Sequence, residues 1–123
     1  MKGRRVRYRD LTVWQKAHEI AKFIYICSRL FPKEDLYGIT SQVRRASLSV
    51  PTNIVEGYSR RSDKEFLNFL NIAYGSLAET EYLISFCHEL KFLRQEDYDH
   101  LSRLMKETGA LLWKFMQTIK ASC

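Results

Sequence analysis

SQVRRASLSVPTNIVEGYSRRS, residues Ser41–Ser62, decides the fold of this chain. Its apolar residues recur every three or four positions, which is the spacing of one face of an α-helix. Pro51 conflicts with that pattern, because a proline in a helix interior removes a hydrogen bond and costs roughly 3 kcal/mol. The apolar stripe nevertheless stays in phase from Ala46 to Ile54. The pattern therefore predicts a helix that is kinked or broken at Pro51. Such a kink either fits the helix around its neighbours or shapes a binding or assembly surface.

The same helical period appears in three further segments, and no segment shows the sustained alternation of a strand. The first predicted helix begins near Asp10, a plausible N-cap, and stops at Pro32. The helix that contains the opening stretch is expected to begin near Asp35. It is expected to end around Gly57, a residue suited to the left-handed end of a helix.

The third predicted helix has the clearest start signal, because Ser62 and Glu65 match the capping box. The last helix is expected to begin near Arg94 or Gln95. Connections of roughly three to five residues between these segments force consecutive helices to run antiparallel. The chain is therefore predicted to be all-α, an antiparallel up-down-up-down four-helix bundle.

The charge of the chain is unevenly placed along its 123 residues. The net charge is +6, and residues 1–9 alone contribute five cations and no acid. We therefore expect a basic N-terminal arm at 1–9 and a four-helix bundle domain at 10–123. The arm is either a disordered solubilising tail or a contact for a polyanion.

The cysteines indicate a reducing compartment. Cys27, Cys87 and Cys123 form no C-x-x-C pair and are odd in number, so free thiols are the simplest interpretation. The basic start is not followed by an apolar run, so no signal peptide is expected. No stretch reaches the roughly 18–20 apolar residues of a membrane span. These observations favour a cytoplasmic protein without a membrane partner.

Catalytic and metal-binding patterns are missing from the sequence. A di-iron bundle needs two Glu-x-x-His motifs, and the nearest match here is the single Asp97-x-x-His100. No zinc spacing, nucleophile elbow or glycine-rich phosphate loop is present. We expect no enzyme activity, no metal and no cofactor.

Arginine pairs are the most suggestive polar feature. On an ideal helix, Arg44 and Arg45 fall ~120° and ~140° from the centre of the apolar stripe, so both are expected to be exposed. Arg60 and Arg61 follow in the next loop, and Lys64 lies in a first helical turn, where a cation opposes the helix dipole. These cations form either a solvated basic face or a surface that contacts phosphates. The candidate nucleic-acid-binding residues are Arg4, Arg5, Arg7, Arg9, Arg44, Arg45, Arg60, Arg61 and Lys64.

Large apolar residues that lie off the predicted stripes favour self-association. Tyrosine and tryptophan are enriched at protein interfaces, and Gly75 and Ala78 would let another helix approach closely. We therefore expect a homo-oligomer. The residues concerned are Tyr25, Leu48, Val55, Tyr74, Tyr82 and Trp113.

The chain resembles the intervening-sequence proteins, a ribosomal-protein-like family encoded in insertions of bacterial large-subunit ribosomal RNA genes. The resemblance rests on DLTVWQKAHEIA (Asp10–Ala21), on the opening stretch with Asn-Ile-x-Glu-Gly after its proline, and on FLNFLNIAYGSLAETEYLI (Phe66–Ile84). It implies a bacterial four-helix bundle that assembles into a ring, a pentamer. It also implies structural roles for Asn53 and Glu56. More distantly, the chain is similar to the accessory protein of diversity-generating retroelements, a basic pentamer that binds nucleic acid and a reverse transcriptase.

The leading hypothesis is a non-catalytic homo-oligomeric bundle that binds RNA or DNA. The alternative is an oligomeric scaffold that recruits a partner protein and has no nucleic-acid role. Net charge and exposed arginines favour the first hypothesis. The aromatic residues that lie off the predicted stripes are compatible with both hypotheses.

Overall fold

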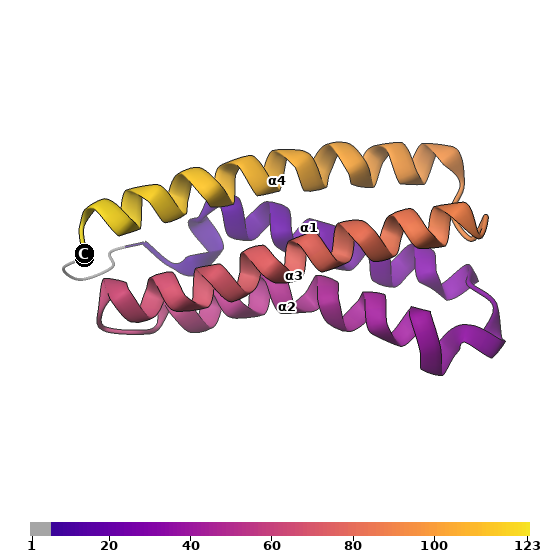
Figure 1. The fold of residues 1–123 in the computed structure, drawn as a ribbon, viewed down its shortest axis with the longest axis horizontal. Coiled ribbons are helices and arrows are strands. Elements are labelled where there is room, and N and C mark those ends of the chain that lie inside the picture. The colour runs from indigo at the N-terminus through magenta and orange to yellow at the C-terminus, as the bar shows by residue number, and fades with distance from the viewer. Residues whose placement is uncertain (1–5) are drawn as a thin grey trace.

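The computed structural model describes residues 6–123, and this part of the chain forms four long helices that run alternately up and down (Figure 1). Each long helix packs against two others, so that α1 and α3 lie diagonally across the bundle, as do α2 and α4. The predicted all-α antiparallel four-helix bundle is confirmed. The helices are α1 (Thr12–Cys27), α2 (Ser41–Tyr58), α3 (Asp63–Glu89) and α4 (Gln95–Ala121). The shorter turns are Tyr8–Asp10, Ser28–Leu30 and Lys33–Asp35, which are 3-10 helices, and Leu36–Thr40, a π-helical turn.

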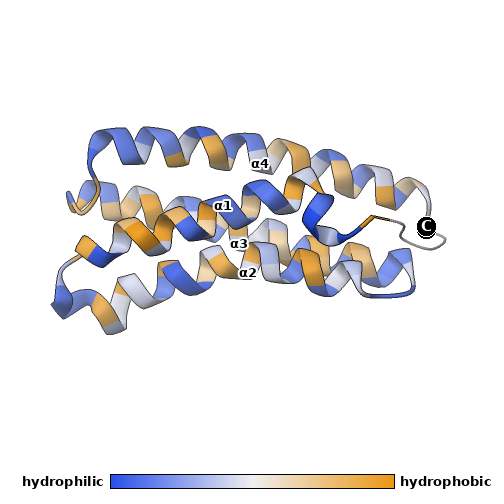
Figure 2. Ribbon diagram, turned by 180° about the vertical axis from the view of Figure 1, so that it is seen from behind, coloured by the Kyte–Doolittle hydropathy of each residue, from blue (hydrophilic) through white to orange (hydrophobic). Residues whose placement is uncertain are grey.

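One buried stripe on each helix forms the core. Hydrophobic and hydrophilic residues alternate turn by turn along every helix (Figure 2), as expected when one face packs inward. The stripes predicted from the sequence supply most of this core. Its largest fully buried hydrophobic side chains are Ile20, Ile24, Val43, Val50, Ile54, Phe66, Leu70, Leu77, Ile84, Leu101 and Leu112. Within the described residues, no helix is both long and apolar enough to cross a bilayer.

Pro51 is buried inside a helix that runs without interruption from one end of α2 to the other. The predicted kink or break at this residue is not confirmed. Nearby side chains bond the backbone of the turn that precedes the proline: the Thr52 hydroxyl donates to the Leu48 carbonyl at 2.7 Å, and Asn53 Nδ2 donates to the Ser49 carbonyl at 2.8 Å. These bonds give the Leu48 and Ser49 carbonyls side-chain donors and support the structural role expected for Asn53.

Two serines precede the proline, and their hydroxyls act differently. The Ser47 hydroxyl donates to the Arg44 carbonyl at 3.0 Å, one turn earlier. Ser49 Oγ lies 2.8 Å from Ser76 Oγ, where a hydrogen bond joins α2 to α3. Ser49 therefore contributes to helix pairing.

The irregular point before α2 is Gly38. The α-helix was predicted to begin near Asp35, but regular α-helical geometry begins at Ser41. Gly38 has φ −111° and ψ −116°, a conformation outside the regions that residues with a Cβ favour. The segment from Pro32 to Thr40 is therefore a chain of tight turns.

The N-cap of α3 was predicted correctly from the sequence, and the N-cap of α1 was not. Ser62 Oγ accepts the Glu65 backbone N–H at 3.1 Å, which confirms the predicted cap of α3. The N-cap expected at Asp10 is wrong, because this residue lies in a 3-10 turn and its carboxylate pairs with Arg7. Leu11 takes the cap position of α1 without a side-chain bond.

The α3–α4 turn closes on Lys91, which has φ 64°. Its backbone N–H donates to the His88 carbonyl at 2.9 Å, and the Phe92 N–H donates to the Cys87 carbonyl at 3.0 Å. This pair of bonds is the Schellman motif, which ends a helix sharply. The reversal brings the start of α4 back onto α1.

Gly57 allows the closest approach between α2 and α3. A Cβ at this position would lie 2.7 Å from Phe69 Cβ and 2.8 Å from Phe66 Cδ1, shorter than any ordinary contact. The prediction that Gly57 provides a left-handed helix end is therefore wrong, because the residue lies inside α2 and is needed for packing. Phe66 is completely buried and contacts the rings of Tyr58 and Phe115.

We predict that Gly57→Ala destabilises the protein by about 1–3 kcal/mol, because the methyl group overpacks the α2–α3 contact. Gly109→Ala is the control, since a Cβ there meets Leu77 at an ordinary 3.6 Å. This control should raise stability by about 0.5–1 kcal/mol through helix propensity. Urea unfolding monitored by circular dichroism measures both, and equal effects of the two substitutions would contradict the packing role of Gly57.

Candidate nucleic-acid interface

Three segments that are distant in sequence meet at one end of the bundle. The Tyr58 hydroxyl donates to the Val6 carbonyl at 2.7 Å, and the Ser122 hydroxyl donates to Asp63 Oδ2 at 2.6 Å. Figure 1 shows the C-terminus and the α2–α3 turn at this end. We name it the arm end and define it as residues 6–10, 58–64 and 119–123.

The α2–α3 turn carries three of the predicted cations. Arg60 is exposed, lies 3.7 Å from Glu56 and places its guanidinium 4.8 Å from the centre of the Phe69 ring. This ion pair agrees with the structural role expected for Glu56. Arg61 and Lys64 are also exposed, and neither forms an ion pair with an acid among residues 6–123. These two cations are therefore available to an external anion.

The described arm residues lie against the bundle. Tyr8 meets the Trp14 ring edge-on at 5.0 Å, and the Arg9 guanidinium lies 5.3 Å from the same ring. Arg7 lies 3.6 Å from Asp10 in an exposed ion pair, which contributes little to stability. Arg9 therefore presents an exposed charge over the ring of Trp14, in the first turn of α1.

Two predicted residues, Arg4 and Arg5, lie outside the described part of the chain. The division between an arm at 1–9 and a bundle at 10–123 stays a prediction.

Arg44 and Arg45 lie about 24 Å from Arg60 along the axis of α2, at 1.5 Å per residue. Arg45 is exposed as predicted. Arg44 was expected to be exposed but is half-buried, because its Nε donates to Ser28 Oγ at 2.8 Å and its guanidinium lies 5.3 Å from the Tyr25 ring. The helical wheel of α2 cannot show this contact, since both partners come from the α1 side. The structure therefore separates the predicted cations into two groups.

Sequence reasoning missed two further cations beside Arg44. Arg29 and Lys33 line the same cavity as Arg44, at the corner between α1 and α2. The only indication in the sequence is that Arg29 precedes the turn at Pro32 and Lys33 follows it. Only the packing of α1 against α2 brings them to Arg44.

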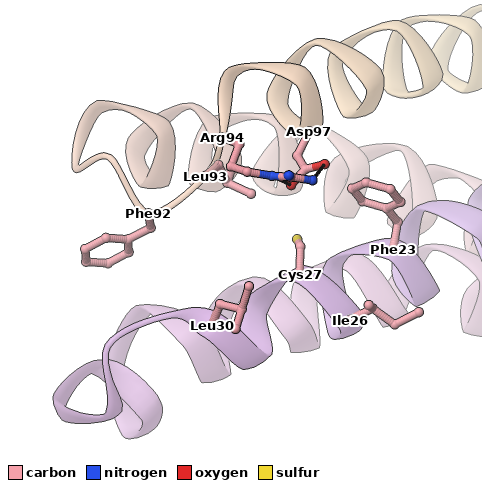
Figure 3. Close-up of a pocket in the computed structure, with 8 residues that line it drawn as sticks. All are labelled: Phe23, Ile26, Cys27, Leu30, Phe92, Leu93, Arg94 and Asp97. Carbon is pink, nitrogen blue, oxygen red and sulfur yellow. Dashed lines mark hydrogen bonds and ion pairs between the residues drawn. The ribbon is translucent and has the colours of Figure 1, made fainter.

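A second cavity, of about 430 Å³, lies between α1 and the start of α4. It is largely apolar, and the Cys27 sulfur points into it toward the ion pair of Arg94 and Asp97, whose Nε–Oδ2 distance is 3.3 Å (Figure 3). The lining residues are Phe23, Ile26, Cys27, Leu30, Phe92, Leu93, Arg94 and Asp97.

Burial keeps the core thiols protonated. It raises the pKa of Cys27 to about 11, with a further increase from the Asp97 charge, and it raises the pKa of Cys87 to about 11, with a further increase from Asp35. A protonated thiol is a poor nucleophile and a poor metal ligand. Among residues 6–123, no three His, Cys, Asp or Glu side chains are grouped so that they could hold a metal ion. This cavity therefore suits an apolar group better than a reactive one.

The fold and the basic end together define a small four-helix bundle with exposed cations at one end. The chain belongs to the 23S rRNA-intervening sequence protein family, whose profile matches residues 9–114. It is also similar to a crystal structure from Bacteroides thetaiotaomicron, a protein of unknown function from the S23 ribosomal protein family. The two share 25% identity with a TM-score of 0.76, over 85% of this chain and 95% of that one. Both descriptions refer to ribosomal RNA or a ribosomal protein family, and neither names an enzyme activity. No curated protein matches the chain in sequence.

We predict that one thiol per chain reacts quickly with iodoacetamide at pH 7.5 and two react slowly. Cys123 is exposed, whereas the thiolates of Cys27 and Cys87 form only as the pH approaches about 11. In the unfolded chain these thiols ionise near 9.0, so the stability that their burial contributes is complete below pH 9 and lost as the pH rises toward 11. Mass spectrometry of the alkylated protein counts the thiols. Rapid labelling of Cys27 at neutral pH would contradict the packing described.

Proposed function

We propose that this protein is a non-catalytic homo-oligomer of the cytoplasm that binds RNA or DNA through the arm end. The observation that carries the proposal is the group of exposed cations on that end. Arg61 and Lys64 have no acid partner within residues 6–123, and the described arm adds Arg9, whose guanidinium lies over the Trp14 ring. Such a group attracts phosphates without selecting a base sequence.

The arm adds to this surface through its sequence. Val6 is tied to Tyr58 of α2, and Arg4 and Arg5 directly precede it in the chain. Guanidinium groups bind phosphate oxygens in pairs, which makes arginine well suited to a nucleic-acid backbone. We therefore assign the arm the role of a second contact with the same strand.

The outer face of α3 supports self-association. Ile72, Gly75, Tyr82 and Phe86 fall within one stripe that is ~165° from the buried stripe of the same helix. Ile72 is 52% exposed and Tyr82 is 66% exposed, and a Cβ at Gly75 would meet nothing within 4 Å. A helix with a second apolar face needs a second partner.

A second apolar patch is formed by α1, by the Ser28–Leu30 turn that follows it, and by α2. It consists of Tyr25, Ile26, Leu30 and Leu48, and Leu30 is 87% exposed. Because α1 and α3 are diagonal in the bundle, the two patches face different directions. When two different patches of one subunit bind each other in neighbouring copies, the contact is head to tail, and it forms a ring if the rotation between copies closes. We propose a ring of five, the number implied by the family resemblance.

The charges beside the two patches are complementary. Lys22 and Arg29 are exposed on the α1 side, whereas Glu79 and Glu89 are exposed on α3. Opposite charges fix the register of a contact and disfavour like-with-like pairing. This arrangement favours contact between α1 of one copy and α3 of the next.

A scaffold that recruits a partner protein is the alternative function. The apolar cavity between α1 and α4 favours it, because such a groove could accept a hydrophobic side chain of another protein (Figure 3). In that case the ring would assemble normally and nucleic acid would not bind.

We predict that Arg61→Glu combined with Lys64→Glu abolishes most binding to a generic single-stranded RNA. Removal of each phosphate contact should lower the slope of log affinity against log salt by about 0.7. Fluorescence anisotropy at several salt concentrations provides the measurement.

The matched control is Arg103→Glu combined with Lys106→Glu, which makes the same charge change on exposed residues of α4. The control should retain most of the affinity, because its two positions lie roughly 20–24 Å along the α4 axis from the arm end. Absence of binding by the unaltered protein at low salt, or equal weakening in both variants, would reject the proposed interface.

We predict that Tyr82→Glu converts the oligomer to monomers, because a buried carboxylate without a partner disrupts an apolar contact. Gln117→Glu, on an exposed turn of α4, should leave the assembly intact. Light scattering after size-exclusion chromatography gives the subunit number, and circular dichroism checks folding. An unchanged oligomer in the Tyr82 variant would contradict the role of α3.

A further inference from the structure

The corner between α1 and α2 holds a cavity of about 360 Å³ that is partly open to solvent and is lined by three cations. Arg29 precedes the turn at Pro32, Lys33 follows it, and Arg44 reaches across from α2. No carboxylate lines this cavity, and none of the three cations forms an ion pair with an acid of residues 6–123. Three like charges around one cavity repel one another, and a bound anion would relieve that repulsion.

Arg44 is held in place for a ligand. Its Nε donates to Ser28 Oγ at 2.8 Å, and the Tyr25 ring lies 5.3 Å from the guanidinium carbon. Among residues 6–123, no hydrogen bond uses either terminal nitrogen of this side chain. A fixed guanidinium with two available nitrogens matches the oxygen spacing of a phosphate group.

Thr40 supplies an independent indication of a ligand. The residue lines the same cavity and is 1% exposed, and its hydroxyl oxygen has no hydrogen-bond partner. A buried hydroxyl without a partner costs about 1–3 kcal/mol. An anion oxygen in the cavity would accept a hydrogen bond from this hydroxyl.

The acids nearest in sequence do not line the cavity. Glu34 and Asp35 follow Lys33 in sequence, but neither lines the cavity. The charge of Asp35 acts on the thiol of Cys87 in α3, where it helps to raise the pKa of that group. Apolar side chains of Phe31 and Leu36 complete the wall and lower the local dielectric, which strengthens attraction to an anion.

We propose that this cavity binds a single phosphate group through Arg29, Lys33, Arg44 and Thr40. Its volume exceeds that of inorganic phosphate and leaves room for an attached sugar. The phosphate could therefore be free, or it could be the terminal monoester of a nucleotide or of a nucleic-acid strand. The site is independent of the proposed nucleic-acid interface, because Arg44 lies about 24 Å from Arg60 along α2.

Isothermal titration calorimetry in a phosphate-free buffer tests the site. The probes are inorganic phosphate, adenosine 5′-monophosphate, adenosine, and a short RNA with and without a 5′-phosphate. Saturable binding of phosphate or the monophosphate, and none of adenosine, is expected. Tighter binding of the monophosphate than of inorganic phosphate identifies a nucleotide, and dependence of RNA affinity on the 5′-phosphate identifies a strand end.

Lys33→Gln and Thr40→Val should each weaken the best-bound probe by about tenfold, because each removes one bond to a charged group. Arg45→Gln is the matched control, since this arginine adjoins Arg44 in sequence but does not line the cavity. Lys33 is exposed, so its replacement leaves folding intact. Failure of the unaltered protein to bind any phosphate probe, or equal weakening by Arg45→Gln, would overturn the proposal.

Discussion

The close approach of α2 and α3 at Gly57 is the constraint on which the rest of the arrangement depends. Phe66 and Phe69 occupy the space that a side chain at Gly57 would need, so the two helices meet within one turn of their connection. The short turn then projects Arg60 and Arg61 outward at the arm end. The same packing brings Tyr58 within hydrogen-bond distance of the N-terminal segment. Close packing in the core therefore positions the basic surface.

Periodicity and capping made the bundle predictable, since both depend on residues close in sequence. The Ser62 cap and the buried stripes needed no knowledge of other helices. The start of α2 and the role of Gly57 were not predictable in this way, because they depend on the Gly38 backbone and on phenylalanines of α3. Arg44 was assigned to an open surface for the same reason, since its partner Ser28 belongs to another segment.

The positive charge of the protein is divided between two environments with different chemistry. At the arm end the cations are exposed, so their attraction to a polyanion is broad and screened by salt. At the α1–α2 corner they line a partly open cavity beside a buried, unpartnered hydroxyl, and we assign to this cavity the recognition of a single phosphate group. The apolar patch on α3 lies diagonally across the bundle from α1, whereas the patch on α1 adjoins the corner cavity through Tyr25 and Arg29.

Photo-cross-linking of a 4-thiouridine RNA, followed by mass spectrometry of the linked peptides, tests the central assignment most directly. Links concentrated in residues 6–10 and 58–64 are the predicted result. Links concentrated on α4 between residues 100 and 110, or spread evenly over the surface, would contradict the assignment of nucleic-acid binding to the arm end.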